Sequence, residues 1–243
     1  MNSKTDSDPL RRALLRLVPL GAAAWLGGFS PLTAEAQNNK TEPHRKEEED
    51  EVSTNEDLMR EHGVLKRVLL VYDEIVRRVR AEREFPPQTV THSATIIRDF
   101  IENYHEKLEE EHLFPRFRKA GKLVDLVDVL QQQHQAGRQV TARVLATAAA
   151  LKSADDRQKL AADLQAFVRM YSPHEAREDT VLFPALHRIV SPHEYDALGD
   201  QFESIERKTF GGDGFEMYVD KVAAIEKQLG TYDLAQFTPS SRG

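Results

Sequence analysis

The chain has 243 residues, of which 40% are hydrophobic and 30% charged, and its formal net charge at pH 7 is −7. This length allows one or two domains with a sizeable core, whereas the acidic balance argues against general affinity for nucleic acid or anionic lipid. Because cysteine is absent, disulfides and thiolate ligands are excluded, and any metal must be held by nitrogen and oxygen atoms.

Residues 1–36 have the pattern of a secretory signal. Paired arginines at Arg11 and Arg12 precede an apolar run that is too short to span a bilayer comfortably, and Ala34 to Ala36 offer a small-x-small cleavage site. The arginine pair followed by "ALLR" resembles a twin-arginine export signal, with Leu10 where Ser or Thr is usual. The resemblance implies a bacterial periplasmic protein, exported already folded, with no stable membrane anchor after cleavage. The alternative is an uncleaved anchor.

Residues 37–54 contain the polar run "QNNKTEPHRKEEEDE", which has almost nothing to bury. Such composition is typical of a disordered linker, in which His44 is solvated.

Residues 55–190 have apolar positions that alternate in steps of four and three, the pattern of amphipathic helices in a bundle. The predicted helices run over about 55–83, 93–119, from after Gly121 to about 151, and 154–190. In each helix a histidine occupies a place on the apolar stripe: His62, His105, His134 and His174. We therefore expect an all-α, antiparallel four-helix bundle with these histidines inside. His62 fits less well, because about twenty residues separate it from its turn against about a dozen for His105.

Residues 191–243 predict one or two further helices that pack on the bundle, followed by a tail. The sequence "SPHE" indicates a capping box in which Ser191 caps a fifth helix and Glu194 reaches back, leaving His193 at the surface. A sixth helix is expected at about 214–229, ending at Gly230.

An internal repeat carries the chemistry. The stretch "HEKLEEEHLFP" from His105 returns as "HEAREDTVLFP" from His174. Residues four apart share a helix face, so His105 lies beside Glu109 and His174 beside Glu178. With His62 and His134 these pairs give four nitrogens and two carboxylates, and burying the carboxylates makes sense only with cations. Six ligands suit two octahedral metals with bridging carboxylates better than one tetrahedral zinc.

The order of these residues, H...HxxxE...H...HxxxE with "LFP" after each pair, resembles the hemerythrin-like HHE cation-binding family over about 58–190. The resemblance implies an up-down-up-down bundle around two non-haem iron ions, bridged by carboxylates or an oxo group, with manganese and zinc as alternatives. The implied ligands are His62, His105, Glu109, His134, His174 and Glu178, with the two glutamates as bridges. Hemerythrin oxygen carriers typically use five histidines, one more than here, which argues against simple oxygen carriage.

Several neighbouring residues have two interpretations. His112 is a candidate seventh ligand, or a half-buried histidine near the bundle end. Glu106 and Glu175 are turned about 100° away from the ligands, which favours a solvated or supporting role. Tyr171 is either a hydrogen-bond donor toward a bound ligand or a core residue, and Pro173 is expected to kink its helix. His92 and His187 are interpreted as surface residues.

The functional prediction is a binding protein for dioxygen or a related diatomic molecule, in sensing, delivery or iron holding. The alternative is a redox enzyme of oxidase, peroxidase or nitric oxide-handling type, in which an open coordination position allows chemistry. A zinc hydrolase is disfavoured, because "HEKLE" and "HEARE" lack the second histidine of HExxH. The sequence identifies no protein partner.

Overall fold

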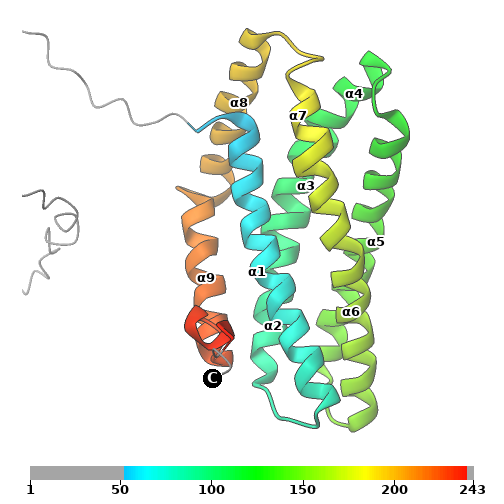
Figure 1. Cartoon of the computed structure of the whole chain (residues 1–243), viewed down its shortest axis with the longest axis vertical. Coiled ribbons are helices and arrows are strands. Elements are labelled where there is room, and N and C mark those ends of the chain that lie inside the picture. Colours follow the sequence, from blue (N-terminus) through cyan, green and yellow to red (C-terminus); the bar gives the residue numbers. More distant parts are fainter. Residues whose placement is uncertain (1–51, 240–243) are drawn as a thin grey trace, which may run out of the picture. The chain divides into compact units, whose positions relative to one another are not determined.

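A computed structural model describes residues 52–239, and within this range the secondary structure is helical with no strand (Figure 1). The predicted signal, residues 1–36, and nearly all of the predicted linker lie outside the described residues. Within the described range, no helix is both long and apolar enough to cross a membrane.

His62 and His105 lie equally far along the chain from the turn that joins their helices. The difference in height that the sequence predicted for His62 is therefore absent. Helix α1 spans Thr54–Arg80, starting where the Ser53 side chain accepts a hydrogen bond from the Glu56 backbone N–H. Helix α2, Pro87–Ile96, begins about six residues before the predicted start, because proline is well tolerated in a first helical turn, where its missing N–H needs no partner. Eighteen residues therefore separate His62 from Arg80, and eighteen separate Pro87 from His105.

Two helical stretches contain π-helical segments at equivalent places in the repeat. After α2 the chain continues through η2 (Ile97–His105), α3 (Glu106–Leu108), η3 (Glu109–Leu113) and α4 (Phe114–Ala120). The later stretch runs through α6 (Ala154–Arg177), η4 (Glu178–Leu182) and α7 (Phe183–Leu186), four residues short of the predicted end. One π segment thus begins at the glutamate of each candidate histidine-glutamate pair, while η2, which ends at His105, has no counterpart in the later stretch.

The π segments η3 and η4 begin at Glu109 and Glu178. In each, the backbone N–H of the phenylalanine of "LFP" donates to the carbonyl of that glutamate five residues earlier. The following proline lacks an N–H and its ring would clash with a carbonyl four residues back, so a widened turn accommodates it.

The remaining helices are α5 (Val124–Ala149), α8 (Pro192–Phe210), α9 (Gly214–Leu229) and the short 3-10 helix η5 (Leu234–Phe237). Helix α1 packs on α6, α6 on α5, and α5 on α2 and η2, both of which also contact α1. These helices enclose one core, while α9 packs against α1 and α2, and α8 against α1 and α9 (Figure 1).

The start of α8 differs in one detail from the predicted capping box. The Ser191 side chain accepts from the Glu194 backbone N–H as expected. The Glu194 carboxylate instead accepts a hydrogen bond from Nε of Arg116, at 2.9 Å. The Glu194 carboxylate therefore binds an arginine of α4 and not, as the sequence predicted, the backbone of the helix cap.

A close packing contact at Gly137 of α5 gives a test of the core. A Cβ at this position would lie 2.0 Å from the Tyr171 hydroxyl oxygen. We predict that Gly137→Ala displaces the Tyr171 ring and lowers the free energy of unfolding by about 1–3 kcal/mol, the usual cost of overpacking. Gly63→Ala is the matched control, because nothing lies within 4 Å of its added Cβ and alanine favours the helix. Denaturant unfolding measures both, and equal effects would contradict the packing argument.

A second test concerns Glu206, a buried residue of α8 that accepts a hydrogen bond from the Phe215 backbone N–H at 2.8 Å. Burial raises the pKa of Glu206 to about 7 against this hydrogen bond. Its contribution to stability is therefore full below about pH 4.5 and lost as pH rises through 7. We predict that the free energy of unfolding of Glu206→Gln, relative to that of wild type, is about 2–3 kcal/mol higher at pH 8 than at pH 4, because glutamine stays neutral. Urea unfolding at both pH values measures this gain.

The control for this test is Glu203→Gln, at an exposed position of the same helix. We expect it to leave the pH dependence of stability as in wild type. If Glu206→Gln changes the free energy of unfolding by the same amount at both pH values, the charge of Glu206 does not have the proposed effect on stability.

Candidate metal centre

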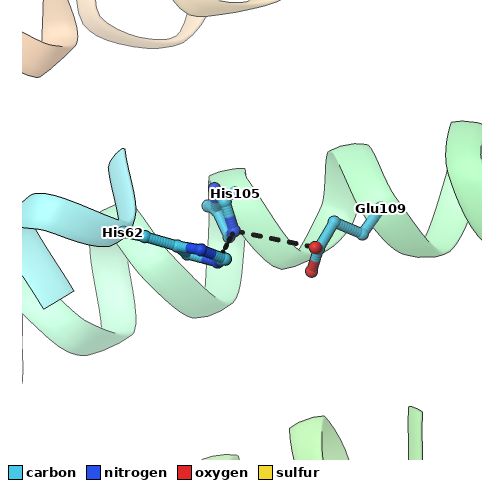
Figure 2. Close-up of side chains that lie close together, drawn as sticks. All are labelled: His62, His105 and Glu109. Carbon is cyan, nitrogen blue, oxygen red and sulfur yellow. Dashed lines mark hydrogen bonds and ion pairs between the residues drawn. The ribbon is translucent and has the colours of Figure 1, made fainter. Parts of the chain in front are cut away.

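Four histidines from different helical segments direct their Nε2 atoms into the core. His62 of α1 and His105 of η2 have these atoms 2.9 Å apart, and His134 of α5 and His174 of α6 have them 3.2 Å apart. All four residues are buried. Figure 2 shows His62 reaching toward His105, with Glu109 one turn farther along the same helical stretch.

Each buried carboxylate lies near histidines of both pairs, and Glu178 is also 4.0 Å from Nε2 of His134. Glu109 lies 3.8 Å from Nε2 of His105 and 3.4 Å from Nε2 of His134. Glu178 lies 3.4 Å from Nε2 of His62 and 3.1 Å from Nε2 of His174. The two glutamates thus join the histidine pairs, as bridging ligands would.

The six residues predicted from the sequence form two groups of potential ligands whose donor atoms lie within 4.8 Å of one another. One group is His62, His105 and Glu109, and the other is His134, His174 and Glu178. His112 belongs to neither group. It is half-buried, and its ring centroid lies 5.6 Å from that of Phe202 on α8.

The outer nitrogen of every histidine also has a partner. The acceptors facing Nδ1 are Asp179 for His62 at 2.7 Å, Glu61 for His105 at 2.6 Å, Glu110 for His134 at 3.1 Å, and Gln133 for His174 at 2.8 Å. Since carboxylate and amide oxygens accept, each Nδ1 carries a proton, and the Nε2 of each imidazole in its neutral form can then bind a metal.

These four acceptors form a ring around the site, which we call the acceptor ring. Each acceptor is the sequence neighbour of a candidate ligand. It accepts the hydrogen bond not of that neighbour but of a histidine on a different helical segment. Thus Glu61, beside His62, holds His105, and Asp179, beside Glu178, holds His62. The sequence pattern alone does not predict this ring. The sequence does place an acceptor side chain next to a candidate ligand at each of these positions. Only the fold shows which histidine each acceptor contacts.

The "LFP" motif has a role that the sequence did not reveal. The Phe114 ring stacks on His134 with centroids 5.5 Å apart, and the Phe183 ring stacks on His62 at 5.3 Å. Each repeat therefore places a buried aromatic ring over a histidine of another segment. These rings exclude water from one face of each imidazole.

Glu106 and Glu175 are buried, which corrects the expectation that they could be solvated. Glu106 accepts a hydrogen bond from the Tyr171 hydroxyl at 2.6 Å and lies 2.7 Å from the Arg138 guanidinium. Burial raises the pKa of Glu106 to about 8, against the lowering by Tyr171 and Arg138. Glu175 pairs with Lys66. Both glutamates therefore lie outside the two predicted ligand groups, although Glu106 forms a further group of possible ligand atoms with Glu110 and His134. Tyr171 directs its hydroxyl at Glu106.

The central charges are unbalanced in the absence of cations. Burial and the nearby Glu178 raise the pKa of Glu109 well above its usual range. Burial also opposes ionisation of Glu178, but His174 and His62 hold its pKa well below the usual range. Although burial lowers it, the pKa of His62 is raised to about 10 by Asp179 and Glu178. Protons thus occupy a site where two carboxylates cannot both ionise without positive charge.

The donor atoms fit metal ions. Within residues 52–239, none of the four oxygens of Glu109 and Glu178 accepts a hydrogen bond of acceptable geometry, although Nε2 of His174 approaches to 3.1 Å. Two inward Nε2 atoms only 2.9 Å apart repel unless a proton or a cation lies near both lone pairs. Imidazole with carboxylate is a donor set that iron, manganese and zinc accept.

Comparison with known proteins agrees with this geometry. Residues 53–186 match the family described as "Hemerythrin HHE cation binding domain". Among relatives, Mb2018 of Mycobacterium bovis and Rv1995 of Mycobacterium tuberculosis, each described as uncharacterized, are 54% identical over 196 residues. The aligned region covers 80% of this chain and 77% of each relative. No solved structure matches.

Metal content separates the core histidines from those at the surface. We predict that His134→Ala lowers the iron bound per chain, because it removes a donor from the centre. His187→Ala should leave iron content unchanged, because His187 is exposed and stacks on Tyr195 with ring centroids 3.8 Å apart. Elemental analysis after desalting measures both. Equal iron in the two variants would remove His134 from the ligand set.

Proposed function

The chain belongs to the hemerythrin HHE cation-binding domain family, and on this premise we propose that it is an exported protein whose up-down-up-down four-helix bundle holds two non-haem iron ions. In this proposal the centre binds dioxygen or a related diatomic molecule, for sensing, delivery or iron holding. Family membership favours iron, while the same nitrogen and oxygen donors also accept manganese and zinc.

One observation carries the proposal: two carboxylates lie at the centre of a helical core, and among residues 52–239 none of their oxygens accepts a hydrogen bond of acceptable geometry. Both side chains are 0% exposed. An uncompensated buried carboxylate costs several kcal/mol, so a core that keeps two of them is built for positive charge. The four inward Nε2 atoms supply the remaining ligands without adding charge.

The proposed assignment divides the ligands between two ions. His62 and His105 would hold one ion, His134 and His174 the other, and Glu109 and Glu178 would contact both. A ferrous pair supplies the electrons that reversible diatomic binding requires. The chain's own residues orient the imidazoles through the acceptor ring and keep water away through the stacked phenylalanines.

Export is proposed from the sequence of residues 1–36. The arginine pair and the small-x-small site favour a bacterial periplasmic location after cleavage. Folding before export would let the centre acquire its metal in the cytoplasm.

A second candidate function is a di-iron redox enzyme of oxidase, peroxidase or nitric oxide-handling type. The observation that favours it is the ligand count, because two histidines per ion and two shared carboxylates leave coordination positions for a reacting molecule. Two pockets, one beside Arg67 and Tyr232 and one beside His92 and Tyr218, are lined by none of the six ligands, so neither would bring an organic substrate to the proposed centre.

Optical spectroscopy tests the proposal and separates the candidates. We predict that the metal-stripped chain, loaded anaerobically with ferrous iron, develops a visible absorption band on exposure to oxygen. Loss of the band when oxygen is removed supports reversible binding. A band that persists supports redox chemistry or iron handling. If no iron is retained and no band forms, the di-iron proposal is wrong.

A further inference from the structure

We infer that the two halves of the centre are unequal and that the half formed by His62, His105 and Glu109 binds its cation more tightly than the half formed by His134, His174 and Glu178. We call these the first half and the second half. The inference rests on the proposed function, because it concerns how that centre fills with metal. It is carried by the charges that surround the acceptor ring.

In the first half both histidines are backed by carboxylates that have no cationic side chain of their own. Asp179 faces His62, and Glu61 faces His105. Across residues 52–239, neither carboxylate forms an ion pair with a lysine or an arginine. The nearby Glu175 does not alter this balance, because Lys66 pairs with it.

In the second half, one histidine is backed by a neutral side chain and the other by a carboxylate that is paired with cationic side chains. His174 is backed by the neutral amide of Gln133. His134 is backed by Glu110, whose carboxylate lies 2.8 Å from the Arg138 guanidinium and 3.1 Å from the Lys107 ammonium. Arg138 also approaches Glu106, so one arginine stabilises two carboxylates on this side.

The ligands themselves do not favour the first half. Each half has two imidazoles, and Glu109 and Glu178 each lie near histidines of both halves, with Glu178 also 4.0 Å from Nε2 of His134 in the second half. A carboxylate behind an imidazole makes that ligand more basic and attracts the metal charge, and its replacement typically costs 10–100-fold in metal affinity. In the first half, Asp179 and Glu61 act in this way without an ion-paired lysine or arginine. Burial raises the pKa of Glu61 to about 8, against the coulombic effects of His62 and Arg60, so the partly exposed Asp179 supplies most of this outer charge. The first ion should therefore enter the first half.

Calorimetric titration of the metal-stripped full-length chain with Mn²⁺ tests the inference. We expect two binding steps whose dissociation constants differ by at least about tenfold, as one outer carboxylate would produce. Asp179→Asn should weaken the tight step by about 10–100-fold and leave the weak step unchanged. Asn keeps the shape of the side chain, and Asp179 is partly exposed, so the fold should tolerate the change.

The matched variant on the other side is Gln133→Glu, at a half-buried position. It gives the second half a carboxylate behind His174 and should strengthen the weak step by a similar factor, so that the two steps converge. A merely structural role for Gln133 would not produce a gain in affinity. Unchanged or weakened second-step binding in this variant would overturn the inference.

Two ligand variants assign the steps. His134→Ala should keep the tight step, and His105→Ala should lose it, with folding checked by circular dichroism. A tight step that survives His105→Ala, or two indistinguishable steps in wild type, overturns the inference while the proposed function stands. If wild type binds no metal ion at all, both the proposed function and the inference are wrong.

Discussion

Two carboxylates buried beside four histidines, with no hydrogen bond of acceptable geometry to their oxygens from the described residues, are the constraint on which the rest of this structure depends. Glu109 and Glu178 lie buried where four helical segments meet. Burial opposes charge on both: the pKa of Glu109 is raised well above its usual range, whereas His174 and His62 hold that of Glu178 well below it. Without cations, the pair is tolerated only with protons shared among the carboxylates and His62. Metal binding would displace those protons, so metal affinity, protonation and fold stability are linked quantities in this protein.

The acceptor ring explains how the helices and the site stabilise each other. Each histidine is fixed at Nδ1 by a residue from a different segment, so the orientation of every ligand depends on correct packing of its neighbour. Conversely, each of these hydrogen bonds fixes how far one helical segment is shifted along its neighbour. The stacking of Phe114 and Phe183 on His134 and His62 adds the same kind of cross-segment contact. The ligands are thus held before any ion is bound, which reduces the ordering cost of binding.

Much of the arrangement was predictable from periodicity and from the internal repeat. The histidines interrupt apolar stripes, and a spacing of four puts each glutamate beside its histidine. The π segments at Glu109 and Glu178 were not predictable, because a proline in "LFP" signals a disturbed helix without specifying which turn widens. The early start of α2 was missed because consecutive prolines suggest a turn, although Pro87 is also suited to a first helical turn. The partners of the outer nitrogens could not be identified, since adjacent residues on one helix serve histidines on another.

The internal repeat is more symmetric in its ligands than in their surroundings. Glu110 and Asp179 both follow a central glutamate, and both back a histidine of another segment. Arg138 and Lys107 neutralise Glu110, whereas Asp179 and Glu61 bond only histidine among their ion-pair partners in the described chain. Repetition therefore accounts for a centre with two equivalent ligand sets, and the nonrepeated cations make them differ in charge. Two ions bound in such a centre would be held in unequal fields and need not share one affinity or one potential, and the residues responsible lie outside the histidine and glutamate motif that identifies the family.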